Sequence, residues 1–289
     1  MKITNKLDLP LSFVEMAKSE YEYKPKQYSV TSILRGLRET ILKRRYHDQI
    51  ESDVSDMIWM LFGQATHHIL EQQEEQDFEL KEEYLKVDVG EGYKLSGIFD
   101  LYDGQKKKIV DYKTSSVWKV IYKDYEDWNK QIKIYAWMMN KIGFGVNVGE
   151  VVAILKDHSK TKAKQKKNYP KHPVKRVKFS IFPKHLKEID TFIYDKFRKI
   201  KKLEKLPDGK LPVCTKEERW RDDDKWAVKK KGNKRAYRVL DSEEEAEKWM
   251  KNNKGNHIEY RPGTDKKCQD YCDVSGFCDY YQENVKEAG

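Results

Sequence analysis

Two aspartates and a lysine are the residues of this 289-residue sequence most able to do chemistry. Asp100 ends the segment G-I-F-D, and Asp111 follows a short apolar run and opens the segment D-Y-K-T. Hard cations such as Mg²⁺ bind oxygen ligands and usually take only one or two carboxylates from a protein. Lys113 would lie beside such an ion, because residues i and i+2 of a strand share a face, and the Tyr112 carbonyl offers another oxygen. These groups suit metal-assisted phosphodiester hydrolysis.

The surrounding elements decide how much weight this pair of acids carries, because an acid two residues before a lysine is common on solvated strands. A D-G turn signal at Asp103-Gly104 predicts a hairpin between two of the strands. The apolar pattern predicts, in order, a helix, three strands, a second helix and a fourth strand, over residues 53–75, 78–89, 93–101, 108–113, 124–141 and 149–155.

Three further candidates fall on the two predicted helices. His67 ends the segment G-Q-A-T-H on the first helix, although a histidine on a helix is more often structural or solvated. Gln131 and Tyr135 are four residues apart on the second helix and therefore share a face. An alternative interpretation makes Tyr135 a core residue and Gln131 a boundary residue.

The four segments G-Q-A-T-H, G-I-F-D, D-Y-K-T and Q-I-K-I-Y resemble, in this order, the motifs of the PD-(D/E)xK nuclease superfamily, in its RecB-like branch. The resemblance extends from about residue 30 to about residue 160, and it also includes a cysteine-rich tail. It implies an α/β chain with a mixed sheet, a restriction-endonuclease-like αβββαβ core, and DNA cleavage that depends on Mg²⁺ or Mn²⁺. The resemblance also implies the roles of the site residues. Metal ligation falls to His67, Asp100, Asp111 and the Tyr112 carbonyl, and catalysis or substrate contact to Asp100, Asp111, Lys113, Gln131 and Tyr135.

Composition agrees with a polyanionic partner. The formal net charge is +10, and charged residues make up 37% of the chain against 38% hydrophobic residues. No apolar run is long enough to span a membrane, and the amino terminus has no signal-peptide pattern. We therefore expect no membrane association and a cytoplasmic location, in a bacterium or a phage-infected host. No P-loop pattern occurs, so the sequence predicts no ATP-driven motor in this chain.

Residues 156–178 form the most basic segment, with ten lysines and arginines against the single acid Asp157. We expect a mobile loop there that follows DNA phosphates by sequence-independent attraction. The alternative is a solvated insertion between two strands. After it the sequence predicts a strand at 174–182 and a helix at 183–205. The candidate DNA-binding residues are Lys162, Lys164, Lys166 and Lys167.

Four cysteines in a cytosolic chain indicate metal binding more than disulfides. Zinc sites favour paired C-x₂-C segments, whereas this chain has C-x₃-C and C-x₅-C spacing and one remote cysteine. We therefore favour a structural [4Fe–4S] cluster, with Zn²⁺ or free buried thiols as alternatives. RecB-like members that carry such a cluster place one cysteine before the nuclease core, where this chain has R-G-L-R at residues 35–38. The candidate ligands are Cys214, Cys268, Cys272 and Cys278.

The sequence predicts three regions. Residues 1–52 are a helical lead-in with a helix at 33–45, and residues 53–205 are the nuclease core with the basic segment. Residues 206–289 hold the cysteines around a small βαβ-like insertion. Its expected strand, helix and strand lie at 226–240, 241–252 and 257–260.

The favoured hypothesis is a metal-dependent DNA nuclease, an exonuclease acting on DNA ends or single strands in recombination or repair, with a phage as a candidate source. Its partners would be single-stranded DNA or duplex ends, together with a recombination protein such as a strand-annealing protein or a helicase. One alternative is a non-catalytic nucleic-acid-binding protein on a nuclease fold. Another is a basic scaffold protein stapled by zinc.

Overall fold

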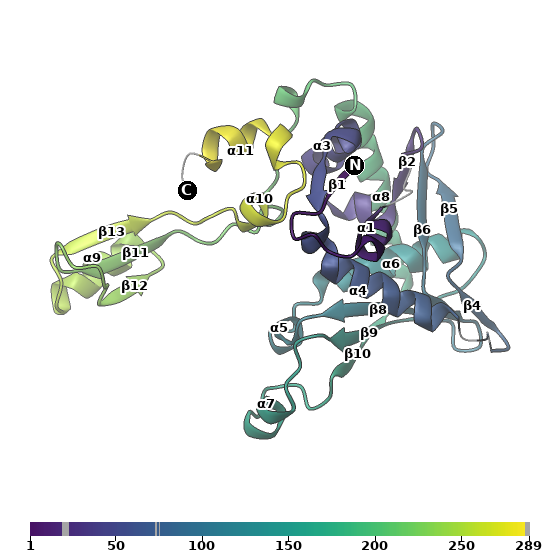
Figure 1. Ribbon diagram of the computed structural model, residues 1–289, viewed down its shortest axis with the longest axis horizontal. Coiled ribbons are helices and arrows are strands. Elements are labelled where there is room, and N and C mark those ends of the chain that lie inside the picture. The colour runs from purple at the N-terminus through teal and green to yellow at the C-terminus, as the bar shows by residue number, and fades with distance from the viewer. Residues whose placement is uncertain (19–22, 73, 75, 287–289) are drawn as a thin grey trace. The chain divides into compact units, whose positions relative to one another are not determined.

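The computed structural model describes residues 1–18, 23–72, 74 and 76–286 (Figure 1). The chain folds as two compact units. Unit 1 comprises Met1–Arg35 and His47–Lys205, and unit 2 comprises Gly36–Tyr46 and Leu206–Gly289. Residues 36–46, which we expected in the lead-in, thus group with the cysteine-rich region. The three-region division stays a prediction.

A five-stranded mixed sheet is the centre of unit 1. Its middle strand β8 pairs parallel with β9 on one side and antiparallel with β7 on the other, as the D-G hairpin signal predicted. The sheet confirms the expected mixed α/β architecture. Its strand order is β10 (Val174–Ser180), β9 (Val148–Leu155), β8 (Lys108–Ser115), β7 (Leu101–Asp103) and β4 (Glu79–Lys81).

Helices α4 and α6 cover opposite faces of this sheet. A Cβ atom on Gly63 of α4 would lie 3.4 Å from Thr114 Oγ1, whereas Gln131 of α6 donates to Asp111. Thr114 and Asp111 point to opposite sides of β8, because side chains alternate along a strand. The helices of unit 1 are α1 (Leu11–Ala17), α2 (Val30–Leu34), α4 (Val54–Glu71), α5 (Val117–Ile121), α6 (Glu126–Lys141), α7 (Lys160–Gln165) and α8 (Pro183–Leu203), with a 3₁₀ turn η1 (His47–Gln49).

Two of the predicted strands are each divided into two shorter strands, and the two breaks lie next to each other. The segment 78–89 divides into β4 and β5, and the segment 93–101 divides into β6 and β7. Glu82 has a positive φ of 48° at the first break, and its N–H donates to the Asp100 carbonyl at 3.2 Å across the second. At the first break the chain passes from the five-stranded sheet into a second sheet, and at the second break it returns. The second sheet consists of β2 (Gln27–Ser29), β6 (Lys94–Ile98) and β5 (Tyr84–Asp88).

The amino-terminal region is tied to the start of α4. Strand β1 (Lys2–Thr4) pairs parallel with β3 (Glu51–Asp53), and α1 packs its Ala17 against Val54 and Leu61. Asp53 caps α4 by accepting from the Ser55 N–H at 3.1 Å. This strand and cap give α4, the helix that carries His67, a defined start.

The predictions of local structure at 33–45 and at 156–173 are wrong. The helix expected at 33–45 is interrupted at Gly36, the N-cap of α3 (Leu37–Arg45). The irregular loop expected at 156–173 contains α7, because Ser159 caps it by accepting from the Lys162 N–H at 3.3 Å. The Tyr169 hydroxyl accepts from the Ser159 N–H at 2.9 Å and so links the two ends of the segment that contains α7.

Unit 2 contains α3 and the carboxyl-terminal elements. The single strand expected at 226–240 is wrong, because β11 (Lys225–Lys229) and β12 (Arg238–Leu240) form an antiparallel hairpin. The insertion is therefore ββαβ, with strand order β12-β11-β13, and Ser242 caps its helix by accepting from the Glu245 N–H at 3.2 Å. The other elements are η2 (Asp208–Lys210), α9 (Glu243–Asn252), β13 (His257–Arg261), α10 (Lys266–Asp270), η3 (Ser275–Phe277) and α11 (Asp279–Asn284). Among the described residues of both units, the helices are too short or too polar to cross a lipid bilayer.

Candidate metal and nucleic-acid site

The break between β6 and β7 positions the Asp100 carboxylate. This side chain is buried, and its Oδ2 accepts a hydrogen bond from the Tyr112 backbone N–H on β8. Its other oxygen, Oδ1, lies 3.3 Å from His67 Nδ1 on α4. Asp100 therefore connects α4 to β8 at the point where the two sheets meet.

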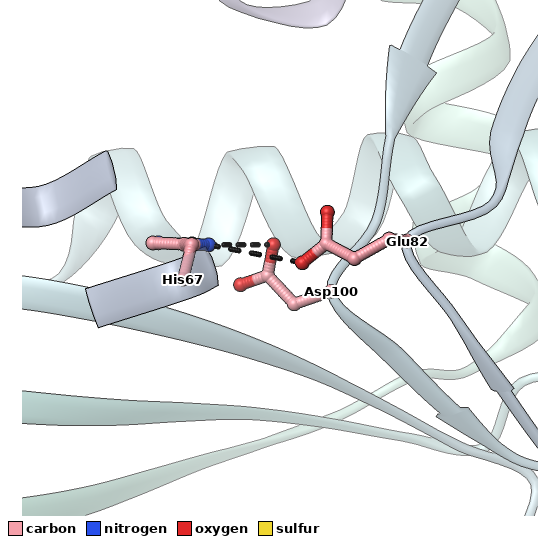
Figure 2. Close-up of side chains that lie close together, drawn as sticks. All are labelled: His67, Glu82 and Asp100. Atoms are coloured by element: carbon pink, nitrogen blue, oxygen red, sulfur yellow. Dashed lines mark ion pairs between the residues drawn. The ribbon is translucent and has the colours of Figure 1, made fainter. Parts of the chain in front are cut away.

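Glu82 is a third potential ligand, which sequence reasoning missed. Its Oε1 lies 3.9 Å from His67 Nδ1. Ligand atoms of His67, Glu82 and Asp100 all lie within 4.8 Å of one another, and Figure 2 shows the three side chains converging. One imidazole nitrogen and two carboxylates suit Mg²⁺, Mn²⁺ or another divalent ion. The available signal was the pair of acids at 82–83, which breaks the alternation of the predicted strand.

Asp111 and Lys113 lie side by side on β8, on the face that α6 covers. Lys113 Nζ is 2.9 Å from Asp111 Oδ1 and 2.8 Å from Oδ2, and Gln131 Nε2 donates to Oδ1 at 3.3 Å. Among the described residues, the buried Oδ2 atom has no hydrogen-bond donor in good geometry, and it forms an ion pair with the Lys113 ammonium. Burial raises the pKa of the Asp111 carboxyl to about 6, against the opposing charge of Lys113. A carboxylate so deprived of water favours a bound ion.

His67 and Tyr135 respond to the same acids. The hydrogen bond to Asp100 raises the pKa of His67, so the metal-free imidazole holds its proton more tightly. Burial and the charge of Asp111 raise the pKa of the Tyr135 hydroxyl, which therefore stays a neutral donor. A Cβ atom on Gly97 would lie only 2.8 Å from Tyr135 Cε1, so this ring position requires glycine in G-I-F-D.

A cavity of about 500 Å³ opens beside Tyr135 and Gly97. Polar side chains of β2 and β6 supply much of its wall. It provides room for part of a substrate beside Tyr135. The remaining lining residues are Lys24, Gln27, Ser29, Val30, Thr31, Tyr84, Ser96 and Ile98.

The structure thus brings His67, Asp100, Asp111, Lys113 and Gln131 into one electrostatic network, with Tyr135 at its edge. Tyr112 contributes its N–H and an edge-to-ring contact with His67, whose ring centroid is 6.2 Å away. A metal-binding role for the Tyr112 carbonyl stays a prediction. The candidate DNA-binding lysines Lys162 and Lys164 lie on α7, Lys166 and Lys167 follow it, and all four are exposed.

The four cysteines lie in one electrostatic neighbourhood of unit 2. Burial, together with the charges of the other three cysteines and of Asp265, raises the pKa of the Cys268 thiol to about 12. Burial also raises the pKa of Cys214 to about 11. Cys278 Sγ accepts a hydrogen bond from Arg38 Nη1 at 3.3 Å.

A family model matches most of this chain, and two solved structures resemble it at low sequence identity. The model of the PD-(D/E)XK nuclease superfamily matches residues 21–279. The solved structure of SSO0001 is 17% identical, with a TM-score of 0.45, over 65% of this chain and 82% of that one. A phage-related exonuclease from Haemophilus somnus 129PT is 11% identical, with a TM-score of 0.29, over 66% of this chain and 78% of that one. A search of curated proteins found no match.

Proposed function

This chain belongs to the PD-(D/E)XK nuclease superfamily, and we propose that it is an exonuclease that cleaves DNA with Mg²⁺ or Mn²⁺. The observation that carries the proposal is the convergence of His67, Glu82 and Asp100, whose ligand atoms lie within 4.8 Å of one another. One imidazole and two carboxylates are a donor set that suits a divalent cation, and the Asp111–Lys113 ion pair lies in the same charge network.

In this proposal His67, Asp100 and Asp111 hold the ion, and Glu82 is an additional carboxylate ligand. When bound, a divalent ion supplies a Lewis acid that stabilises charge on the phosphate and activates the attacking water. Lys113 places a fixed positive charge beside the reacting group. Gln131 holds Asp111 in position, and the neutral Tyr135 hydroxyl is a hydrogen-bond donor at the edge of the cavity.

The substrate would be DNA ends or single strands processed in recombination or repair. The basic segment supports a polyanionic substrate, with Lys162, Lys164, Lys166 and Lys167 contacting phosphates. A helicase or strand-annealing protein is the proposed partner, because such proteins generate or consume single strands. The cytoplasm of a bacterium or of a phage-infected cell is the proposed location.

We also propose a structural [4Fe–4S] cluster held by the four cysteines. A Cβ atom on Gly36 would come 3.0 Å from Cys214 Sγ, so Cys214 fills the space beside the segment where related nucleases carry their upstream cysteine. The C-x₃-C and C-x₅-C spacing of Cys268, Cys272 and Cys278 differs from the paired C-x₂-C segments of zinc sites and supports the cluster proposal.

The test is digestion of end-labelled single-stranded and duplex DNA with Mg²⁺, with Mn²⁺ and with EDTA. We expect stepwise shortening from an end with either metal and none with EDTA. DNA binding without cleavage under every metal condition would favour the alternative, a non-catalytic DNA-binding protein. A visible absorption band near about 400 nm in the purified protein would support the cluster, and metal analysis showing only zinc would contradict it.

A further inference from the structure

Three large aromatic rings of unit 1 are open to water at the carboxyl end of β8. Trp59 of α4 is 59% exposed, Trp118 of α5 is 53% exposed and Tyr122, directly after α5, is 73% exposed. The Trp118 and Tyr122 rings are stacked, with centroids 5.9 Å apart and planes inclined by 22°. Lys156 Nζ lies 4.0 Å from the Trp59 ring centroid. We call these four residues the aromatic platform.

Backbone hydrogen bonds join the parts of the aromatic platform. The Lys156 N–H donates to the Ser115 carbonyl at 3.0 Å, which ties the end of β9 to the end of β8. The Asp157 carboxylate accepts from Ser116 Oγ and from the Val117 N–H, both at 2.7 Å, and so holds the start of α5. The platform therefore belongs to the hydrogen-bonded frame of unit 1, and the acid next to Lys156, Asp157, is already occupied by these two donors.

The aromatic platform adjoins the proposed catalytic site along two elements. Strand β8 carries Asp111 and Lys113 and ends at Ser115, where the platform begins. Helix α4 carries Trp59 and His67, eight residues apart, which is about 12 Å at 1.5 Å per residue. A nucleic-acid strand held at His67 would reach the platform within a few nucleotides.

Charge and ring chemistry together identify the occupant. The platform includes Lys156, and the α7 lysines follow it within ten residues. Exposed rings beside a basic track are the combination that binds unpaired strands, because every base has a face that can stack. Paired bases of a duplex are stacked on each other and offer no such face. A lysine over an aromatic ring adds a cation beside the stacking surface.

We infer that the aromatic platform binds unpaired bases of single-stranded DNA and gives this chain a preference for single strands over duplexes. The inference rests on the proposed function for its location beside a nuclease site. The platform stacks two bases, one on the Trp118–Tyr122 pair and one on Trp59, while the lysines contact the intervening phosphates.

Binding of fluorescently labelled oligo-dT and of a duplex of equal length should be measured by anisotropy in EDTA, where cleavage is absent. We expect Trp118→Ala with Tyr122→Ala to weaken oligo-dT binding by about tenfold or more, and Trp59→Ala by about tenfold. Duplex binding should change less than about twofold, since it depends mainly on phosphate contacts. The single variant Trp118→Phe should keep most of the oligo-dT affinity of the unaltered protein, because an aromatic ring face is retained.

Phe182→Ala is the matched control, because Phe182 is also 52% exposed but follows β10 at the opposite end of the sheet. It should leave both affinities unchanged, and thermal unfolding should show that every variant folds. Equal weakening of single-strand and duplex binding, or no weakening of oligo-dT binding, would overturn the inference. The platform is tested by binding in EDTA, whereas the nuclease proposal is tested by cleavage with metal. Either proposal can therefore fail without the other.

Discussion

The carboxylate site of unit 1 and the cysteine group of unit 2 are both candidate centres for a cationic group, but they are built differently. The carboxylate site contains its own counter-charges, because Lys113 pairs with Asp111 and the imidazole of His67 lies against Asp100. Its backbone is set by sheet pairing and by the N–H of Tyr112. Such a site can keep its shape when the ion leaves.

The cysteine group, unlike the carboxylate site, has few counter-charges of its own. Cys214, Cys268 and Cys272 are thiols whose pKa values are raised by burial, and Arg38 donates to Cys278 alone of the four. The chain around them is held by side-chain contacts, including Lys267 to Glu39 at 2.6 Å and the stacked rings of Tyr46 and Phe277. We expect the first centre to tolerate loss of its ion and the second to lose structure without its cofactor.

The largest expected effect is on cleavage at the carboxylate site. Asp111→Asn should lower the cleavage rate by about 10³-fold or more, equivalent to ~4 kcal/mol of transition-state stabilisation. The measurement is the initial rate on end-labelled DNA with saturating Mn²⁺. Oligonucleotide affinity in EDTA serves as the control and should stay within a few-fold. Full cleavage by the variant would remove Asp111 from the mechanism.

The same substitution should stabilise the metal-free fold. A carboxyl whose folded pKa is about 6 stabilises the fold at low pH, and this contribution is lost as the pH rises through about 6. At pH 7.5 the ionised group therefore costs about 1–3 kcal/mol, which Asp111→Asn removes. Thermal unfolding in EDTA should show a higher Tm for the variant at pH 7.5 and a smaller difference at pH 5. Added Mn²⁺ should raise the Tm of the unaltered protein only.

The second region should respond to loss of one thiolate with loss of structure. Cys268→Ser should abolish the visible absorption band and expose unit 2 to proteolysis, because a cofactor-dependent fold loses its binding free energy. Asp270→Ala is the matched control, since Asp270 is exposed in the same short helix α10. Limited proteolysis followed by mass spectrometry reads the result. A Cys268→Ser protein that is as resistant as the control would break the proposed contrast between the regions.

A moderate effect is expected from the carboxylate that sequence reasoning missed. Glu82→Gln should weaken Mn²⁺ binding by about 10- to 100-fold, because it removes one charged group near the ion. The adjacent Glu83→Gln is the control, since Glu83 is exposed and outside the ligand group. Isothermal titration with Mn²⁺ measures both. Equal affinities for the two variants would exclude Glu82 from the site.

The smallest effect concerns a buried acid away from both centres. Burial tends to raise the pKa of Glu150, but hydrogen bonds from Arg176 and Lys108 hold it below its ordinary value. This contribution is present above about pH 4.5 and is lost as the pH falls further. Arg176→Met should lower stability at pH 7 by less than any variant above changes it, since the arginine is largely exposed. The difference should shrink towards pH 3 in urea unfolding, and Lys175→Met on the same strand should show no such pH dependence.

The sheet and the acid–lysine segment were predictable because their signals are local. The apolar run before Asp111 predicts β8, and the alternation of side chains places Lys113 beside Asp111. Gln131 and Tyr135 were predictable as one face of α6 from helical spacing alone. Those predictions needed no knowledge of distant parts of the chain.

The missed features depend on contacts between distant segments. Glu82 joins the site because its backbone breaks the strand and pairs with Asp100, eighteen residues later. Helix α3 groups with unit 2 because its side chains contact residues more than 160 positions away, such as Arg38 with Leu211 at 2.8 Å. Propensity and periodicity report neither kind of contact.

The most direct test of the central claim is a crystal structure of the protein with Mn²⁺, in which anomalous scattering locates the ion. We expect one peak about 2 Å from oxygen atoms of both Asp100 and Asp111, with His67 as a further ligand and Lys113 within contact distance of the coordinated group. A peak bound by His67 and Glu82 without Asp111, or no peak at saturating Mn²⁺, would contradict the account.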